Sequence, residues 1–451
     1  MSTRAEPIAI RAAAPASSDD AIGGPSPNSA DAALLYGLVA LLVFGFVAFG
    51  AVEPWSVFTI EAGALFLFSV WAIKHLAAER FSIAWNPLYP GFALLAVAVA
   101  IQLGLGLTVY GYATQQQAMK YVAYLFLVVV ANECFHNRAL INRFGLLLSL
   151  FGFVLAAVAL AQDVTHSSKL LFVRIPQETG WSYGPYLNHN HYAGLMEMLA
   201  PFPLTLAMAP YLRGRIRALL GAAAAIMVAT IFLCASRGGV IAFFAQAAFL
   251  ALVFARGRQR RRKIAITAVF AFILLAALFA FGKGTAFDRL ASLRDPVLKS
   301  EIPGLRLAVL RDSHAMFLER PALGWGLGTF EHVYPQFRSF YTNDHIGHAH
   351  NDYLELLLET GLIGFAGVLW FVLVLLQSGW KKVPQWKTDL TGTVKIAATA
   401  GCIGILVHSF LDFNLQITAN AALFYVLSTM VVGSLEENTL PSVARSAGSL
   451  E

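Results

Sequence analysis

Four short polar clusters interrupt a largely apolar chain, and they carry residue types suited to phosphate binding and proton transfer. They are Asn188-His189-Asn190-His191, Ser236-Arg237-Gly238-Gly239, Arg306 with the glycine-rich stretch 324–330, and the stretch 347–355, which contains His348, His350, Asn351 and Glu355. Arginine binds phosphate oxygens in a fork geometry and stays charged. Histidine is the usual base for taking a proton from an attacking hydroxyl. Arg237, Arg306 and His350 are therefore the set expected for transfer from a diphosphate-linked donor to a hydroxyl acceptor.

Each cluster also has a purely structural interpretation. Three asparagines can cap helices, because their side chains accept hydrogen bonds from N-terminal amide groups: Asn188, Asn190 and Asn351. Arg237 can anchor a helix end at the membrane surface, and Arg306 can be a solvated charge in a polar loop. Glu355 and Glu359 stand in the first turns of an apolar run, where the helix dipole favours a carboxylate. Capping does not exclude a further role in binding.

The elements that must position these clusters are membrane spans. Of the 451 residues, 58% are hydrophobic and 13% are charged, whereas soluble domains carry roughly a quarter charged residues. We expect an all-α polytopic membrane protein with about twelve transmembrane helices. The candidate spans are twelve apolar runs: Ala32–Val52, Trp55–Ile73, Leu88–Leu107, Tyr121–Ala131, Phe144–Ala161, Tyr192–Leu212, Ala218–Cys234, Val240–Phe254, Ile264–Phe281, Leu354–Leu376, Ile396–Leu411 and Ile417–Val432.

Lysine and arginine predict how the spans are oriented. With the N-terminus in the cytoplasm, the basic connections face inward, and residues 256–263 alone supply six Lys or Arg. The short outer connections 51–54 and 108–117 have none. This bias follows the positive-inside rule, predicts that both termini are cytoplasmic, and does not indicate nucleic-acid binding. The expected divisions are a disordered tail 1–31, a membrane domain 32–433 with a long periplasmic loop 283–353, and a cytoplasmic tail 434–451.

The histidines also suggest a metal site, because zinc takes three or four such ligands. His345, His348 and His350 are close in sequence, and His189 and His191 fall on the same predicted side of the membrane. The outer loops, however, offer no cysteine and no H-x-x-x-H pair. The cysteines lie in or beside apolar runs, without metal-ligand spacing: Cys134, Cys234 and Cys402. We therefore favour a site without metal or other cofactor over a metalloenzyme.

At these residues the chain resembles the O-antigen ligase and polymerase superfamily of bacterial membrane glycosyltransferases. Ligases of that superfamily share a His followed by Asn, Ser or Gln, then nine residues and Gly-x-x-Gly. His350-Asn351, residues 352–360 and Gly361-Leu362-Ile363-Gly364 fit this pattern. Ser236-Arg237-Gly238 matches the Ser-Arg-Gly element, Arg306 precedes a matching stretch 321–330, and residues 188–193 match a further element. The matching core covers residues 188–376.

The resemblance implies a metal-independent glycosyltransferase of lipopolysaccharide or exopolysaccharide biosynthesis in the bacterial inner membrane, with its active site facing the periplasm. By that likeness His350 acts on the acceptor hydroxyl. Arg237 and Arg306 hold the diphosphate of an undecaprenyl diphosphate-linked glycan. The implied acceptor is lipid A–core or a growing glycan chain. Further substrate contacts are expected from Asn188, His189, Asn190, Arg174, His348, Asn351 and Glu355, while Arg289, Arg294 and Arg311 are alternative diphosphate ligands.

Several functions stay open at this point. The superfamily joins ligation to lipid A–core, polymerisation of repeat units and transfer to protein, and its motifs overlap. The short C-terminal tail favours a polysaccharide ligase or polymerase over a protein O-oligosaccharyltransferase. Twelve spans with cytoplasmic termini are also a common plan for a polysaccharide or lipid transporter. Transporters usually place ionisable groups near mid-membrane, whereas here they cluster at one face.

Overall fold

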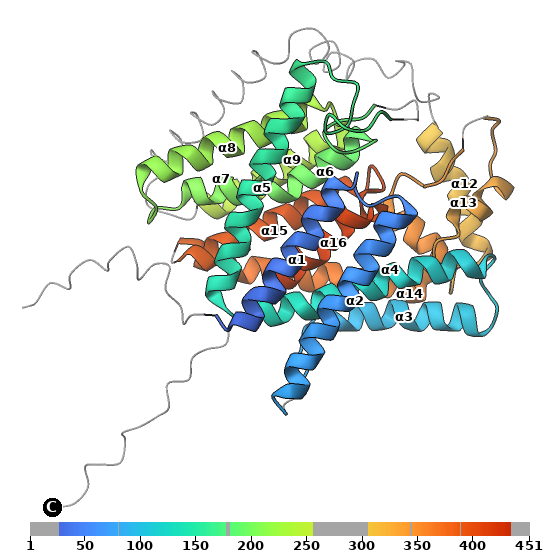
Figure 1. The fold of residues 1–451 in the computed structure, drawn as a ribbon. Coiled ribbons are helices and arrows are strands. Elements are labelled where there is room, and N and C mark those ends of the chain that lie inside the picture. Colours follow the sequence, from blue (N-terminus) through green and yellow to red (C-terminus); the bar gives the residue numbers. More distant parts are fainter. Residues whose placement is uncertain are drawn as a thin grey trace, which may run out of the picture.

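The structure is a computed structural model that describes residues 27–79, 81–176, 181–255, 305–342, 345–387 and 389–433. Throughout these ranges the regular structure is helical (Figure 1). Two isolated backbone bridges, Leu170 with Arg174 and Tyr183 with Tyr186, are the nearest approach to a strand in the described part of the chain. The predicted all-α fold is confirmed.

Most of the helices overlap the predicted apolar runs. Ahead of the undescribed stretch 256–304 they are α1 (Ser29–Val47), α2 (Pro54–Ala77), α3 (Tyr89–Gly104), α4 (Gly111–Cys134), α5 (Arg138–Val164), α6 (His189–Leu199), α7 (Pro201–Met208), α8 (Gly214–Leu233) and α9 (Arg237–Ala255). After it come α12 (Leu305–Glu319), α13 (Phe330–Val333), η2 (Tyr334–Gln336), α14 (Asp352–Lys382), η3 (Val383–Lys387), α15 (Leu390–His408), η4 (Asn414–Gln416) and α16 (Thr418–Val432). The predicted run Ile264–Phe281 lies outside the described residues.

Seven of the described helices are long and apolar enough to cross a membrane: α1, α2, α5, α8, α9, α14 and α15. The helices α3 and α16 are apolar but shorter. These features confirm the prediction of a polytopic membrane protein. The predicted run Tyr192–Leu212 forms two short helices, because α6 ends just before Pro201, whose ring cannot continue an unbroken helix.

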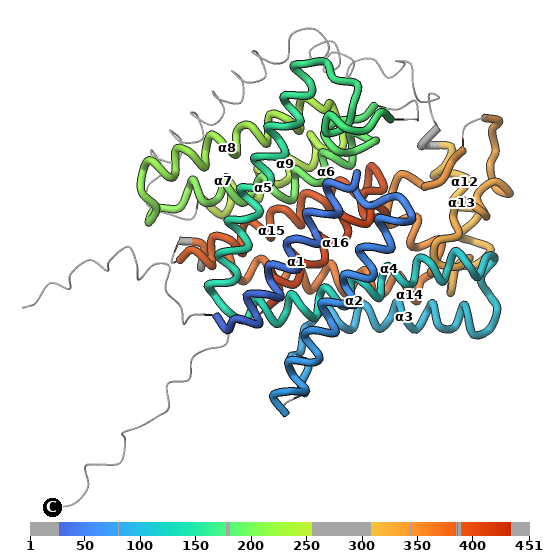
Figure 2. The backbone as a smooth tube through the Cα atoms, in the orientation of Figure 1, coloured from blue at the N-terminus to red at the C-terminus, as the bar shows by residue number. Residues whose placement is uncertain are grey.

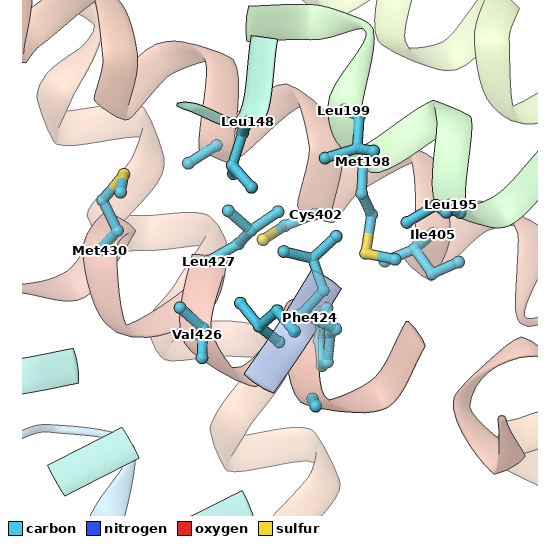
Figure 3. Packing of buried hydrophobic residues seen from close by; sticks show 14 of the residues in the cluster. Leu148, Leu195, Met198, Leu199, Cys402, Ile405, Phe424, Val426, Leu427 and Met430 are labelled. Carbon is cyan, nitrogen blue, oxygen red and sulfur yellow. The ribbon is translucent and has the colours of Figure 1, made fainter. Parts of the chain in front are cut away.

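Helix α15 lies at the centre of the bundle. It contacts α5, α6, α7, α9, α14 and α16, and most of its residues are buried (Figures 1 and 2). Glycines let its neighbours approach, since a Cβ at Gly401 would lie 2.9 Å from the carbonyl oxygen of Met198 on α6. Figure 3 shows this core, where Met198 and Leu199 of α6 face Cys402 and Ile405 of α15.

The region predicted as one long outer loop contains structure of its own. Within residues 305–342, helix α12 packs against α14, and α13 with η2 covers the start of that helix. Val309, Phe330 and Tyr334 share a buried cluster with Ala349 and Leu358. This layer therefore packs against the start of α14 and against Ala349, which stands between His348 and His350 in the sequence.

Candidate active site

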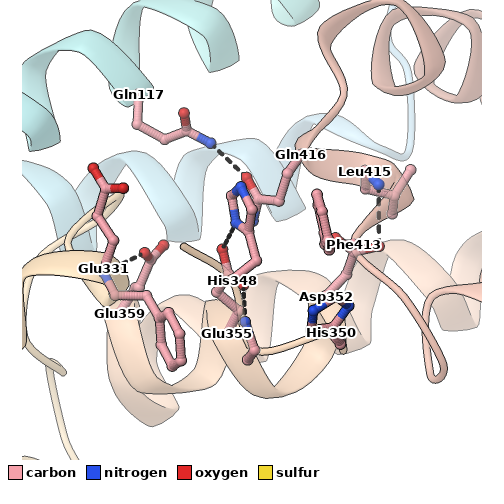
Figure 4. Close-up of polar contacts among 12 residues, drawn as sticks. Gln117, Glu331, His348, His350, Asp352, Glu355, Glu359, Phe413, Leu415 and Gln416 are labelled. Carbon is pink, nitrogen blue, oxygen red and sulfur yellow. Dashed lines mark hydrogen bonds and ion pairs between the residues drawn. The ribbon is translucent and has the colours of Figure 1, made fainter. Parts of the chain in front are cut away.

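Several helix ends meet where the predicted polar clusters lie. The backbone N–H of Asp352, at the start of α14, donates to the carbonyl oxygen of Ser409 after α15 at 2.9 Å. The Tyr353 hydroxyl donates to the carbonyl oxygen of Leu406 at 2.8 Å. The Asn190 side chain, at the start of α6, reaches Asp412. The starts of α6 and α14 and the turn 409–417 therefore form one polar face, which we call the site end. Figure 4 shows the start of α14 and the turn.

His350 and Asp412 form a histidine–carboxylate pair at the site end. His350 Nδ1 lies 3.2 Å from Asp412 Oδ1, and the Asp412 side chain is only 1% exposed. Asp412 also accepts hydrogen bonds from Asn190 Nδ2 at 2.5 Å and from the backbone N–H of Phe413 at 2.9 Å. Burial opposes ionisation, yet the hydrogen bond to His350 and the nearby imidazole of His191 hold the pKa of Asp412 well below its ordinary range.

This geometry suits His350 to act as a base. A carboxylate at Nδ1 fixes the proton there, which leaves Nε2 as the acceptor. The backbone at His350 has φ of +51°, an uncommon conformation for a residue with a side chain. Such conformations concentrate at functional sites. The charged Asp412 would then stabilise the imidazolium that forms when His350 accepts a proton.

His348 has a carboxylate partner of its own. Its Nδ1 lies 2.8 Å from Glu355 Oε1, while Glu355 Oε2 accepts the backbone N–H of Ala349 at 2.7 Å (Figure 4). The helix-dipole interpretation of Glu355 is therefore incomplete, because this carboxylate binds a neighbouring histidine. Glu359, one turn further along α14, accepts the backbone N–H of Phe330 at 3.0 Å. It ties α14 to the glycine-rich stretch, and its hydrogen bond goes to this stretch and not to a histidine.

Arg237 is the first residue of α9 and is exposed. The Ser236 hydroxyl accepts the N–H of Gly239 at 3.1 Å and so caps the helix. A Cβ on Gly238 would lie 2.5 Å from the His408 ring, so only glycine allows α9 to begin there. The backbone carbonyl of His408 accepts the N–H of Asp412 at 3.1 Å. His408 therefore contacts both the Ser-Arg-Gly element and the turn that holds Asp412.

The other arginines are placed differently. Arg306 lies in the first turn of α12, one turn before Val309. Val309 shares a buried cluster with Ala349. The structure describes the backbone of Arg306 but not its side chain. Arg174 pairs with Glu53, and its guanidinium lies 4.9 Å from the Phe49 ring centroid. Arg311 is exposed on α12, and Arg289 and Arg294 fall outside the described residues. The structure thus brings neither Arg174 nor Arg311 to the His350–Asp412 pair.

The asparagines divide into caps and ligands. Asn188 accepts the N–H of Asn190 at 2.9 Å and caps α6, while Asn351 accepts the N–H of Leu354 at 3.0 Å and caps α14. The capping interpretation is confirmed for both. The Asn190 side chain is not a cap, because it binds Asp412. The His189 ring stacks on Trp181, with 4.3 Å between ring centroids.

Two motif stretches that are distant in sequence lock together. At Gly361 α14 is interrupted, with φ of +60° and ψ of −167°. The carbonyl oxygens of Leu358 and Glu359 then accept the N–H groups of Trp325 at 3.1 Å and Gly326 at 3.0 Å. A Cβ on Gly361 would lie 2.3 Å from the carbonyl oxygen of Ala322, so glycine is required here. This pairing explains why the glycine-rich stretch and the Gly-x-x-Gly element occur together.

Asp412 and Phe413 are site residues that the sequence analysis missed. They lie in the short connection between the predicted runs Ile396–Leu411 and Ile417–Val432. The predicted topology places that connection on the same side as His350, so a charged residue there was a usable signal. The three histidines between residues 345 and 350 each have a carboxylate partner of their own: Glu331 for His345, Glu355 for His348 and Asp412 for His350. No group of three potential metal ligands is present among the residues that the structure describes.

Comparison with known families agrees with the motifs. Residues 222–369 match the family model described as O-antigen ligase. The resemblance to the O-antigen ligase and polymerase superfamily is confirmed. No curated protein matches the chain. The O-antigen ligase match includes Arg237, Arg306 and His350, whereas Asn190 and Asp412 lie outside it on either side. It supports an enzyme of ligase or polymerase type that joins a lipid-linked glycan to an acceptor.

Proposed function

We propose that this protein transfers a glycan from undecaprenyl diphosphate to a hydroxyl acceptor at the periplasmic face of the bacterial inner membrane, as an O-antigen ligase or a surface-polysaccharide polymerase. The observation that carries the proposal is the His350–Asp412 pair at the site end, within a chain whose residues 222–369 match O-antigen ligases. A buried carboxylate that orients an imidazole is the arrangement expected for a base acting on a hydroxyl.

The reaction follows as a single displacement. The acceptor hydroxyl gives its proton to His350 Nε2 while its oxygen forms a bond to the anomeric carbon of the donor sugar. The bond between that carbon and the diphosphate oxygen breaks, and its electron pair leaves with the undecaprenyl diphosphate. Arg237 and Arg306 neutralise the charge that develops on the leaving group. One displacement inverts the configuration at the sugar carbon.

An apolar cavity supports a donor with a lipid tail. It lies between α3, α14 and α16, is partly open to the outside, and its walls include Phe92, Phe371 and Phe424. Asp352 and Gln416 also line this cavity, and Asp352 follows His350 by two residues. A largely apolar chamber with polar residues of the site end in its wall suits a substrate with a reactive head and a hydrocarbon tail.

The placement of charged residues supports the proposed orientation. At the end of the bundle away from His350, Arg138 pairs with Asp389 at 2.8 Å, Lys74 pairs with Asp31 and Glu133, and Lys395 donates to the Gly433 carbonyl. Inner-membrane proteins keep Lys and Arg on the cytoplasmic side. The site end would then face the periplasm.

The deciding test is the glycan profile of a deletion strain, covering lipopolysaccharide, exopolysaccharide and lipid-linked intermediates. Glycan-free core together with accumulated lipid-linked polymer identifies a ligase. Single repeat units on lipid or core identify a polymerase. An unchanged profile while the gene is expressed would remove polysaccharide transfer, and protein O-glycosylation or lipid transport would then be tested by mass spectrometry of glycoproteins and by vesicle uptake.

A further inference from the structure

Two imidazoles share one phenyl ring at the site end. The His348 ring stacks on Phe413 with 4.2 Å between centroids and 22° between planes, and the His350 ring meets the same ring edge-on at 5.1 Å and 70° (Figure 4). Each Nδ1 atom is held by a buried carboxylate, Glu355 for His348 and Asp412 for His350. Both side chains remain accessible, with 37% and 28% of their surface exposed.

Because Nδ1 of each ring is paired with a carboxylate, only the Nε2 atoms of His348 and His350 can bind a substrate or exchange a proton with it. Neither Nε2 atom takes part in a hydrogen bond with the described residues. One carboxylate partner and one shared aromatic neighbour hold each imidazole in place. The sequence spacing of two residues, with Ala349 between them, places both rings against Phe413.

The charges around His348 favour its protonated form. Burial lowers the pKa of His348, but the facing carboxylates of Glu355, Glu359 and Asp352 on α14 raise it more strongly, to about 9. Across Phe413, the imidazoles of His191 and His350 also face this group. The cation lies over the face of Phe413, where the ring quadrupole attracts positive charge. The close pairing with Glu355 therefore favours the protonated form of His348, which carries an N–H group at Nε2.

We propose that His348 is an anion ligand of the active site, which donates its Nε2 proton in a hydrogen bond to a diphosphate oxygen of the donor while His350 acts on the acceptor hydroxyl. This inference rests on the proposed function and deepens it. Two titratable groups in different environments of one site commonly take different roles. The proton stays on His348, so the step adds no further proton transfer to the displacement.

The main alternative is that His348 only packs on Phe413 and ties down Glu355. The variant His348→Phe separates the two, because phenylalanine keeps an aromatic ring on Phe413 but cannot donate a hydrogen bond. The variant His348→Gln is the second probe, because it keeps a donor but lacks the positive charge. The matched control is His345→Phe, since His345 is exposed and pairs only with Glu331 among the described residues.

The experiment measures binding of inorganic pyrophosphate to the purified full-length protein in detergent, by calorimetry, from pH 7 to pH 10. We expect wild-type binding to weaken about tenfold as the pH rises through 9, and His348→Phe to bind roughly tenfold more weakly at pH 7 with little further loss above it. His345→Phe should bind as the wild type does. Each variant is first shown to be folded by its thermal transition.

Two results overturn the inference, and they are distinguishable. If folded His348→Phe binds pyrophosphate as tightly as the wild type while losing transfer, His348 is not a diphosphate ligand, and the proposed transferase function stands. If the wild type binds no pyrophosphate at any pH, the diphosphate site itself fails, and the proposed function fails with it. Retained binding by His348→Gln at the wild-type level at pH 7 would also refute a role for the positive charge.

Discussion

Asp412 Oδ1 lies 3.2 Å from Nδ1 of His350, although 62 residues separate the two in sequence. One belongs to the segment that precedes α14 and the other to the turn between α15 and α16. The backbone bond from Asp352 N–H to the Ser409 carbonyl oxygen holds these segments together at 2.9 Å. The pair therefore depends on how α14 and α15 pack, and it connects the matched O-antigen ligase region to the final pair of helices.

Replacing Asp412 should impair transfer more than it impairs folding. In Asp412→Asn the amide can present its N–H groups to His350 and stabilise the wrong tautomer, and it cannot stabilise an imidazolium. We expect kcat for glycan transfer to fall by about 10²- to 10⁴-fold. The measurement is transfer by purified variant protein with lipid-linked donor. Activity within a fewfold of the wild type would show that Asp412 does not support His350.

Asn190 and Asn188 form a matched pair for testing the network. Asn190 Nδ2 donates to Asp412, whereas Asn188 only caps α6. Asn190→Ala removes one hydrogen bond from a buried carboxylate, which is worth roughly 1–3 kcal/mol, and should lower transfer about tenfold or more. Asn188→Ala should lower the thermal transition with little loss of specific activity, since a cap contributes about 1 kcal/mol. Equal loss of activity in both variants would contradict a separate role for Asn190.

Much of this architecture could be predicted from the sequence, because hydrocarbon thickness and apolar length restrict the choices. Apolar runs such as Phe144–Ala161 and Ile396–Leu411 are matched by the helices α5 and α15. The sequence analysis did not predict the helix break at Pro201, because the residues on both sides are apolar and form one uninterrupted apolar run. The helices α12 and α13 were also missed, because they lack the long apolar run of a membrane span. They are packed against α14 instead.

The site was predictable only in part, for a different physical reason. The local spacing predicted His350, Asn351 and the glycines of α14, because these residues form one motif within a short stretch of the sequence. The partners of His350 and His348 could not be read from spacing, since they depend on which faces of helices meet. Arg174 shows the same limit: its charge suggested a phosphate ligand, yet its partner is Glu53, on the turn before α2.

The bend at Gly361 should be sensitive to a single methyl group. In Gly361→Ala the added Cβ would meet the Ala322 carbonyl oxygen, and the φ of +60° would cost about 1–3 kcal/mol in strain. We expect a lower thermal transition and weaker transfer. The control is Gly104→Ala, at the end of α3, where a Cβ meets nothing within 4 Å. A transition in Gly361→Ala equal to that of Gly104→Ala would show that the bend is not required.

The His348–Glu355 pair should make stability depend on pH. The pKa of His348 is raised from 6.5 to about 9 in the folded protein, chiefly because Glu355 outweighs the effect of burial. A raised pKa stabilises the folded state fully below the unfolded value, near 6.5, and that contribution disappears as the pH rises through about 9. The thermal transition of the wild type should therefore fall over this window, and that of His348→Phe should fall less. Parallel curves for the two proteins would contradict the pairing.

Arg237 should not be replaceable by lysine. Its guanidinium is exposed at the start of α9, and no hydrogen bond within the described residues occupies it, so it is open to a ligand. Lysine keeps the charge but loses the fork geometry that matches a diphosphate, and loss of a charge-assisted hydrogen bond should reduce transfer by roughly 10- to 100-fold. The matched control is Arg213→Lys, an exposed arginine at the start of α8 on the opposite end of the bundle. In vitro transfer is measured for both variants, and full activity of Arg237→Lys would show that the residue serves only as a charge at the membrane surface.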